Sequence, residues 1–271
     1  MIKPRKKIFF VATREFAVNA FLMTHLNVLS KYFDITVIVN TDNSFFLKKN
    51  GLDIKVIPLR ISRKIHLFSD LLCLLKLFYI FFKESPDIIH SITPKAGFLT
   101  MLSGYLSHIS VRLHTFTGQV WVNERGFKRW MLKTFDSLTG HLSTFNIIDS
   151  WSQRDFLIKE NVVCLKKTVV FGSGSVSGVD LNKFIPSKKV FIDVRNELLI
   201  PLDSFIFIYL GRLNKDKGVL DLAKAFSVIR SKRAYLIVVG PDEGNYSNQI
   251  QRLSGKNRDR LRLIGFSDKP Y

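Results

Sequence analysis

The sequence predicts an α/β protein in which two units of doubly wound parallel sheet follow one another along the chain. Short apolar runs alternate with longer stretches in which apolar residues recur at helical spacing. Most of the short runs are apolar throughout, which is typical of strands that helices cover on both faces. Strand–helix alternation of this kind predicts a doubly wound sheet. A polar hinge at Asp180–Lys189 separates the two units.

The first unit alternates strands with helices from its start. Its strands are expected at Ile8–Ala12, Ile35–Val39, Ile54–Pro58, Ile88–His90, Val111–Phe116, Leu142–Ile147 and Thr168–Phe171. Its helices are expected at Ala17–Lys31, Leu67–Lys83, Ala96–Ser107, Lys128–Leu138 and Ser152–Lys159.

The second unit is shorter. Its strands are expected at Phe205–Leu210, Tyr235–Val239 and Leu261–Ile264, and its helices at Val219–Arg230 and Tyr246–Leu253. Three strands are too few to close a doubly wound domain, so we expect missing residues, rather than a partner chain, to complete it. The expected domains are residues 1–184 and a partial second domain at residues 185–271.

The composition is that of a globular protein with a basic excess. Hydrophobic residues make up 46% of the 271 residues, which is enough to bury a core. Lys and Arg number 41 against 22 Asp and Glu, a formal net charge of +19. Such a surface attracts nucleic acid, anionic lipid or phosphorylated substrates, although AT-rich coding sequence also enriches Lys. Because the cations are scattered and no nucleic-acid-binding module is visible, no nucleic-acid partner is expected.

The cysteines and the amino terminus favour a cytoplasmic protein. Cys73 and Cys164 have no second ligand at metal spacing, so reduced thiols are expected rather than a disulfide framework or a zinc site. No signal peptide is expected, because the basic start leads directly into a strand.

The most apolar segment is Leu67–Phe82. Asp70 and Lys76 interrupt it, and it is shorter than a bilayer-spanning helix needs to be. It suits a helix packed on a parallel sheet, which is the simpler expectation. With Arg63 and Lys64 before it, it also suits a helix that lies on a bilayer surface.

The sharpest local signal is the turn Gly211–Gly218, which follows the first strand of the second unit. Its helix N-terminus offers unpaired N–H groups, and Arg212 and Lys217 add positive charge, a combination that suits a diphosphate. An ordinary solvated loop has a similar composition. The turn is not a Walker A loop, and neither first strand is followed by a Gly-x-Gly-x-x-Gly fingerprint.

This turn and the helix after it resemble the signature of glycosyltransferase family 4. Gly211-Arg212-Leu213, Lys217-Gly218 and Leu222–Phe226 carry the resemblance. Further segments agree in order and spacing: Pro86–His90, Pro94–Gly97, Ser177–Asp180 with Phe184 and Pro186, Leu236–Pro241 and Leu263–Phe266. His114–Trp121 and Gly172–Val176 resemble a subgroup that builds bacterial surface glycans on a polyprenyl-diphosphate carrier.

The resemblance implies a GT-B fold, in which two Rossmann-like domains face a cleft, with the second domain incomplete here. It implies a retaining hexosyltransferase that moves a hexose or N-acetylhexosamine from a UDP-sugar to a lipid-linked saccharide, in O-antigen or capsule synthesis. The enzyme would be cytoplasmic and peripheral on the inner membrane. The chain contains no Asp-x-Asp, and neither a metal nor another cofactor is expected.

The resemblance also assigns residues on the donor side. Arg212 and Lys217, with Gly211 and Gly218, would hold the donor diphosphate. The nucleotide side would contain Gly240, Gly265 and Phe266.

The acceptor-side candidates are Arg14, His90, Lys95, His114 and Thr117. Thr117 stands where many family members have His, which leaves its role open. His114 also suits a satisfied histidine at a strand end. Arg14 lies in a loop that replaces the family's Gly-Gly pair, and a surface role suits it equally.

The family's Glu-x7-Glu element would fall after Tyr271, and no protein nucleophile is evident, so the catalytic residues stay unassigned. The alternative to an enzyme is a truncated, non-catalytic binding module that retains the diphosphate and acceptor contacts.

Overall fold

The computed structural model describes residues 4–62, 65–182 and 184–267, and the chain divides into two compact units, residues 1–178 and 179–271. The division falls a few residues before the 184/185 boundary expected from the sequence. Arg63 and Lys64 lie outside the described residues.

The first unit is built on a seven-stranded sheet in which each strand is parallel to its neighbours, in the order β3-β2-β1-β4-β5-β6-β7. The strand order reverses between β1 and β4. In open parallel sheets, ligands bind at the carboxyl ends of the strands beside such a reversal. The strands are β1 (Lys7–Ala12), β2 (Asp34–Val39), β3 (Lys55–Pro58), β4 (Ile88–Ile92), β5 (Val111–Phe116), β6 (Phe145–Ile148) and β7 (Thr168–Val169).

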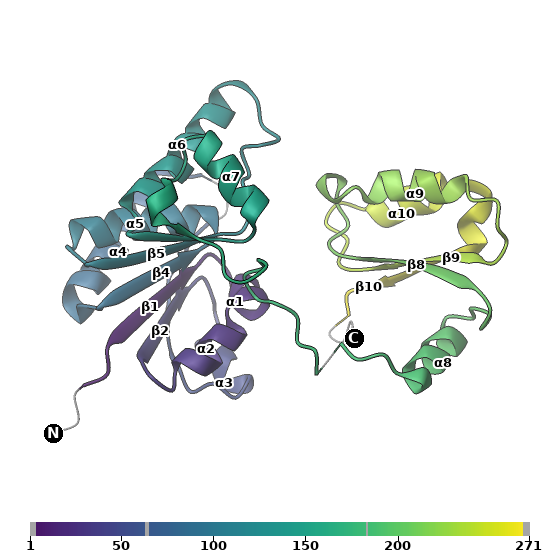
Figure 1. The fold of residues 1–271 in the computed structure, drawn as a ribbon, viewed down its shortest axis with the longest axis horizontal. Helices are drawn as coiled ribbons and strands as arrows, with labels where there is room; N and C mark the ends of the chain where they lie inside the picture. Colours follow the sequence, from purple (N-terminus) through teal and green to yellow (C-terminus); the bar gives the residue numbers. More distant parts are fainter. Residues whose placement is uncertain (1–3, 63–64, 183, 268–271) are drawn as a thin grey trace. The chain divides into compact units, whose positions relative to one another are not determined.

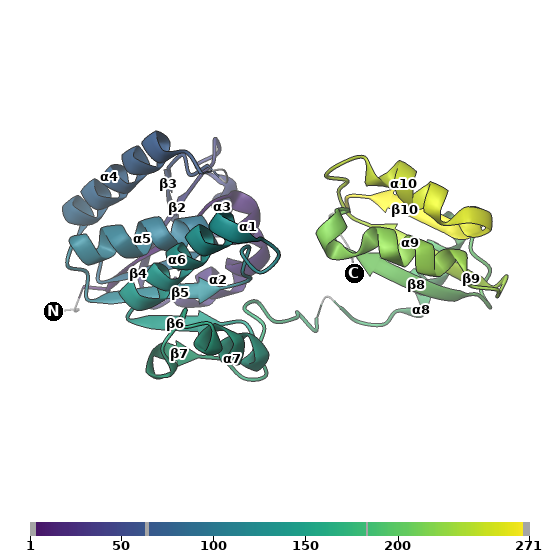
Figure 2. The same ribbon diagram turned by 90° about the horizontal axis from the view of Figure 1, so that it is seen from above.

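Helices cover both faces of this sheet (Figures 1 and 2). One face carries α1 (Glu15–Phe21), α2 (Met23–Leu29) and α3 (Phe46–Lys49), and the other carries α4 (Leu67–Glu84) and α5 (Pro94–Leu106). α6 (Gly126–Leu142) packs beside α5, and α7 (Trp151–Lys159) and the 3-10 turn η1 (Leu165–Lys167) connect β6 to β7.

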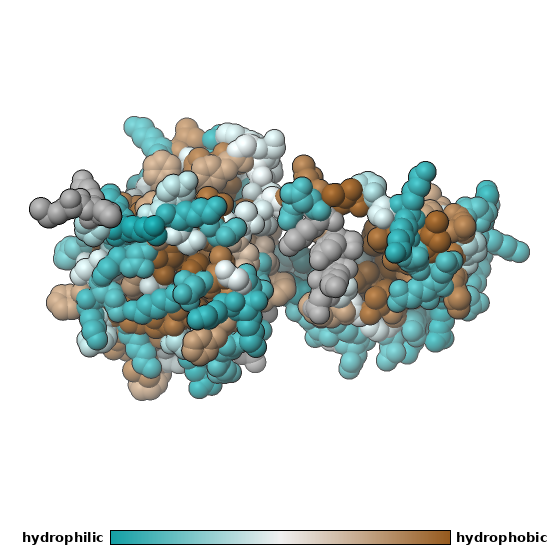
Figure 3. All heavy atoms as spheres, turned by 90° about the horizontal axis from the view of Figure 1, so that it is seen from below, coloured by the Kyte–Doolittle hydropathy of each residue, from teal (hydrophilic) through white to brown (hydrophobic). Residues whose placement is uncertain are grey.

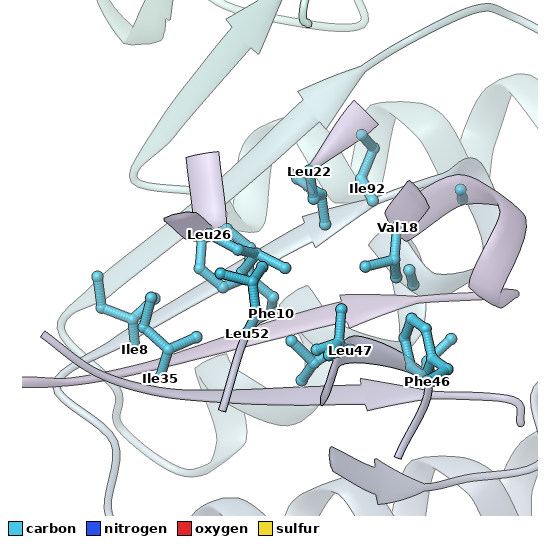
Figure 4. Close-up of a cluster of buried hydrophobic side chains, with 14 residues drawn as sticks. Ile8, Phe10, Val18, Leu22, Leu26, Ile35, Phe46, Leu47, Leu52 and Ile92 are labelled. Atoms are coloured by element: carbon cyan, nitrogen blue, oxygen red, sulfur yellow. The ribbon is translucent and has the colours of Figure 1, made fainter. Parts of the chain in front are cut away.

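Alternate side chains of β1 build a core on each face of the sheet. Phe10 packs with Leu22 and Leu26 in the cluster beneath α1 and α2 (Figure 4). The next residue, Val11, points to the opposite face and belongs to the cluster that contains Leu77 of α4. Fully burying a side chain of this size contributes about 1.5–3 kcal/mol, so both helical layers are held firmly on the sheet.

The second unit has a three-stranded parallel sheet in the order β10-β9-β8. One face is covered by α9 and α10, and residues that follow α8 pack on the other (Figure 1). The elements are α8 (Lys188–Glu197), β8 (Phe205–Leu210), the 3-10 turn η2 (Lys215–Lys217), α9 (Val219–Ser227), β9 (Ala234–Val239), α10 (Tyr246–Leu253), the 3-10 segment η3 (Gly255–Arg260) and β10 (Leu261–Gly265).

The structure confirms the α/β class, but several element boundaries were wrong. The single helix expected at Ala17–Lys31 is two helices that meet at Leu22, where φ is −112° instead of the regular helical value while the side chain stays buried in the core. The strand expected from Leu142 begins at Phe145, because α6 continues to Leu142.

Two helices were not expected. α3 is a single short turn, and α8 begins inside the segment interpreted as a polar hinge. There the Ser187 hydroxyl accepts a hydrogen bond from the Val190 N–H, which satisfies one of the donors at the helix start.

Candidate functional site

The donor-side candidates lie at the carboxyl ends of the three strands of the second unit and in the loops that follow them. The turn after β8 leads through η2 into α9, and the Asn214 side chain accepts a hydrogen bond from the Lys217 N–H (3.1 Å). Gly218 has φ +72°, a left-handed conformation that glycine adopts without steric cost, and it is the N-cap residue of α9. Lys217 is therefore held two residues before the first residue of α9, and the N-terminus of a helix attracts anions.

The loops after β8 and β9 are joined through their backbones. Leu213 N–H donates to the Pro241 carbonyl (2.9 Å), and Glu243 N–H donates to the Leu213 carbonyl (3.2 Å). Gly240 has φ +144°, and a Cβ added there would lie 1.9 Å from the Gly211 carbonyl oxygen. The close approach of these loops therefore requires a residue without a side chain at position 240.

A third loop joins the same edge. Gly240 N–H donates to the Gly265 carbonyl (2.7 Å), and Gly265 has φ +75°. Phe266 follows it with its side chain exposed. The structure thus brings together the loops that carry Gly211, Arg212, Gly240 and Gly265.

Arg212 is paired with a residue that the sequence did not suggest. Its Nη1 contacts both carboxylate oxygens of Glu243, at 3.0 and 3.2 Å, and Asn214 Nδ2 donates to Glu243 Oε2 (2.9 Å). The Lys217 ammonium, by contrast, makes no ion pair within the part of the chain that the structure describes. The side chain of Arg212 and the backbone N–H of Lys217 are thus linked through Glu243 and Asn214.

Asp242, beside Glu243, organises the loop before α10. Partial burial opposes its ionisation, but hydrogen bonds from Ser247, Tyr246 and Gly244 outweigh that effect and lower its pKa to about 2. The carboxylate remains ionised and accepts hydrogen bonds from the N–H groups at the helix start, so it stabilises the loop.

The two candidate histidines of the first unit lie within strands. His90 of β4 is hydrogen bonded through Nε2 to Thr115 Oγ1 (2.8 Å), and His114 of β5 through Nδ1 to Ser91 Oγ (2.8 Å). Burial lowers the pKa of His90 to about 4 and that of His114 to about 3, so both imidazoles are neutral at pH 7. A Cβ on Gly97 would lie 2.4 Å from His114 Cε1, so α5 packs directly on this ring.

The other acceptor-side candidates follow the carboxyl ends of neighbouring strands. Exposed Arg14 follows β1, Lys95 follows β4 and half-buried Thr117 follows β5. Lys95 forms a 2.6 Å ion pair with Asp70, which ties α5 to α4. These three residues therefore share one edge of the sheet, whereas His90 and His114 lie inside it.

Two threonines mark the reversal of strand order on this edge. Thr13 follows β1 and Thr93 follows β4, and their hydroxyl oxygens are 2.5 Å apart. Thr93 has φ +84°, a conformation that is strained for a β-branched residue. Sequence patterns did not mark this pair, because neither the strain nor the contact is visible in residue spacing.

The described residues contain no cluster of His, Cys, Asp or Glu that could hold a metal ion. Among them, too, no helix combines the length and the apolar character that crossing a membrane requires. Hydrophilic side chains are spread over both units on the face drawn in Figure 3, with hydrophobic ones between them.

This chain is similar in sequence and in fold to known glycosyltransferases. A family model described as glycosyl transferase 4-like matches residues 7–138, and one described as glycosyl transferases group 1 matches residues 190–270. The capsular polysaccharide biosynthesis glycosyltransferase CapM of Staphylococcus aureus is 33% identical over 205 residues, which are 75% of this chain and 53% of that protein.

A second relative is the UDP-Gal:alpha-D-GlcNAc-diphosphoundecaprenol alpha-1,3-galactosyltransferase of Escherichia coli, 27% identical over 215 residues, or 76% of this chain and 54% of that protein. Among solved structures, HepE of Anabaena in complex with UDP superposes with a TM-score of 0.71 at 18% identity, covering 97% of this chain and 70% of that one. Sucrose-phosphate synthase of Thermosynechococcus elongatus gives 0.67 at 17% identity, covering 98% and 71%.

The two matched regions are similar in sequence to glycosyltransferases, and the folds of the two units are those of GT-B structures. The chain belongs to glycosyltransferase family 4. It spans about half the length of the curated relatives that it matches.

Proposed function

We propose that the whole protein is a retaining glycosyltransferase of bacterial surface-polysaccharide synthesis. It transfers a hexose or N-acetylhexosamine from a UDP-sugar to a polyprenyl-diphosphate-linked saccharide. The observation that carries the proposal is the loop that holds Arg212 and Lys217 at the start of α9, within the group 1 family match. The E. coli relative, whose name gives a UDP-sugar donor and a diphosphoundecaprenol acceptor, supports both substrate classes.

The donor diphosphate would bind where Arg212, Lys217 and the N-terminus of α9 supply positive charge. As the bond between the sugar and the diphosphate breaks, negative charge grows on the leaving phosphate. Preplaced cations stabilise that charge more than they stabilise the bound substrate, and losing one such contact costs roughly 3–4 kcal/mol of barrier.

Retention would follow from attack on the same face of the sugar. The acceptor hydroxyl oxygen forms the new bond to the anomeric carbon, and its proton passes to the leaving phosphate oxygen. This route needs no protein nucleophile.

On the acceptor side, the edge that carries Arg14, Lys95 and Thr117 would meet the lipid-linked saccharide. Arg14 is the candidate for the acceptor's diphosphate, because its side chain is exposed beside the reversal of strand order. His90 and His114 would act only indirectly, since both are hydrogen bonded inside the sheet. A lipid-linked acceptor also implies peripheral association with the cytoplasmic face of the inner membrane.

Calorimetric titration of the 271-residue chain with UDP tests the donor site. Arg212→Ala should weaken binding about ten- to hundredfold, since hydrogen bonds to charged groups are each worth about 1.5–3 kcal/mol. Lys217→Ala should also weaken it. Lys224→Ala is the matched control, because this lysine of α9 makes only a surface ion pair with Asp221 (3.7 Å). If UDP affinity is unchanged in both Arg212→Ala and Lys217→Ala, these residues do not form the donor-diphosphate site.

Turnover with a UDP-sugar and a polyprenyl-diphosphate saccharide separates the enzyme from the alternative of a non-catalytic binding module. Transfer by residues 1–271 alone would exclude the module. UDP binding without transfer, together with transfer by a longer form, would locate further catalytic groups outside this segment.

A further inference from the structure

α4 is apolar on two opposite faces. Its inner face places Cys73, Leu77 and Phe81, spaced four apart, in the core of the first unit. Its outer face exposes a second set of large apolar side chains to solvent: Phe68, Leu71, Leu72, Leu75, Tyr79 and Phe82. These positions follow the spacing i, i+3, i+4, i+7, i+11 and i+14, so they form one continuous row along the helix.

This outer row differs from what a helix on a soluble α/β unit requires. Such a helix is expected to present charged and polar residues on the side away from the core. Phe68 and Phe82, at the two ends of the row, are 76% and 72% exposed. A contiguous exposed apolar surface of this kind marks a site of interaction.

The charges around the row are positive. Both acidic side chains of α4 are already paired, Asp70 with Lys95 (2.6 Å) and Glu84 with Lys55 (3.2 Å). Lys76 and Lys83 lie on the same helix and are exposed.

A groove of about 350 Å³ runs beside the helix, and both cationic and apolar side chains line it. Arg60 and Lys76 contribute the cations, and Leu72, Leu75 and Tyr79 contribute apolar surface from the outer row. A negatively charged head group with an apolar tail matches this combination.

We propose that the outer face of α4 docks on a bilayer that contains anionic phospholipids. The apolar row enters the boundary between head groups and acyl chains, and Arg60, Lys76 and Lys83 face the lipid phosphates. The choice of a bilayer rests on the proposed lipid-linked acceptor, which an enzyme must reach at a membrane surface.

Co-sedimentation of the full chain with vesicles tests the proposal. We expect stronger binding to vesicles of phosphatidylglycerol and phosphatidylethanolamine than to vesicles of phosphatidylcholine alone. The double variants F68S/F82S and K76E/K83E should each weaken binding to the anionic vesicles by at least about tenfold, because they remove buried apolar area and phosphate attraction respectively.

The matched control is F127S/W130S on α6, where the two side chains are 74% and 62% exposed. It should bind vesicles as the unaltered chain does. The proposal would be overturned if F68S/F82S bound the anionic vesicles as strongly as the unaltered chain does. It would also be overturned if F127S/W130S lost as much binding as F68S/F82S. So would a self-association in sedimentation velocity that F68S/F82S abolishes while vesicle binding persists, which would assign the face to a second copy. UDP affinity should be unchanged in F68S/F82S, so a failed donor site and a failed docking face give separate results.

Discussion

Arg212 and Glu243 meet across two loops of the second unit, with Arg212 Nη1 3.0 Å from Oε1 and 3.2 Å from Oε2 of the carboxylate. Both contacts are made by the same nitrogen, so the carboxylate holds one end of the guanidinium. Asn214 holds the same carboxylate and also binds the Lys217 N–H. Glu243 is therefore a candidate positioning residue for the proposed phosphate site.

Glu243→Ala should weaken UDP binding by up to about fivefold. Both side chains are 37% exposed, and partly exposed ion pairs contribute only about 0.2–1 kcal/mol. Glu243→Gln retains an oxygen that can accept from Arg212 and should recover part of the affinity. The measurement is the dissociation constant of UDP, with uridine as a ligand that lacks phosphate and should be unaffected. Tighter UDP binding by Glu243→Ala would mean instead that the carboxylate competes with the diphosphate.

Gly240→Ala should destabilise the second unit by about 2–4 kcal/mol. The added Cβ would lie 1.9 Å from the Gly211 carbonyl oxygen, at a φ that side chains rarely adopt. Gly118→Ala is the control, because a Cβ there meets nothing within 4 Å. Urea unfolding followed by circular dichroism compares the two variants. Equal stability would show that the two loops can separate without cost.

The stability of the first unit should fall as the pH drops from about 6.5 towards 3. Burial lowers the pKa of His114 to about 3 in the folded chain, whereas the unfolded chain takes up this proton near pH 6.5. Within that window the unfolded state binds more protons, so acid favours unfolding, by at most about 1.4 kcal/mol per pH unit per histidine. Above pH 6.5 this group adds no dependence on pH.

His114→Gln should therefore show a shallower loss of stability between pH 6.5 and 4 than the unaltered chain. Asp136 acts in the opposite direction, because burial raises its pKa to about 6, but it contributes equally to both proteins. The three tryptophans, Trp121, Trp130 and Trp151, all belong to the first unit, so their fluorescence in urea reports its unfolding. Identical pH slopes would contradict the neutral, buried state of His114.

Asp136→Ala should cost about 1–3 kcal/mol, because it leaves the buried Trp121 Nε1–H without its acceptor, Asp136 Oδ2, at 2.8 Å. Asp136→Asn should cost less, since the amide oxygen can accept the same hydrogen bond. Urea unfolding by circular dichroism at pH 7 measures both. A larger loss for Asn than for Ala would mean that Trp121 does not depend on this hydrogen bond.

The parts of the fold that were predictable are those that depend on neighbouring residues. Continuous apolar runs such as Ile8–Ala12 predicted the strands, and Gly211, Arg212 and Gly218 predicted a turn at a helix start. The pairing of Arg212 with Glu243 was not predictable, because the residues are 31 positions apart and meet only after β8 and β9 pair. The sequence of Leu67–Phe82 suited both a helix packed on the sheet and a helix on a bilayer surface. Which of its apolar residues face outward was not predictable, since apolar residues all around a helix show no period that separates the core side from the exposed side.

The surroundings of the candidate histidines also depend on contacts between residues that are distant in sequence, so they were not predictable either. The sequence placed His90 and His114 near strand ends, but whether a strand residue points into a ligand site or into the packing of a helix depends on register. Here Ser91 pairs with His114 in the sheet and Gly97 brings α5 onto the ring. The glycine was visible in the sequence, but the surface that it approaches was not.

Thr93, at the reversal of strand order, keeps its hydroxyl against Thr13 at the expense of a backbone strain of about 1–3 kcal/mol. Glycine would relieve the strain and remove the hydroxyl at the same time. The first unit is thus less stable than its scaffold allows at the edge where ligands are expected. A substitution at Thr93 is therefore the obvious way to raise the thermal stability of the first unit. Because it would also remove the hydroxyl, stabilising substitutions are better placed elsewhere in the fold.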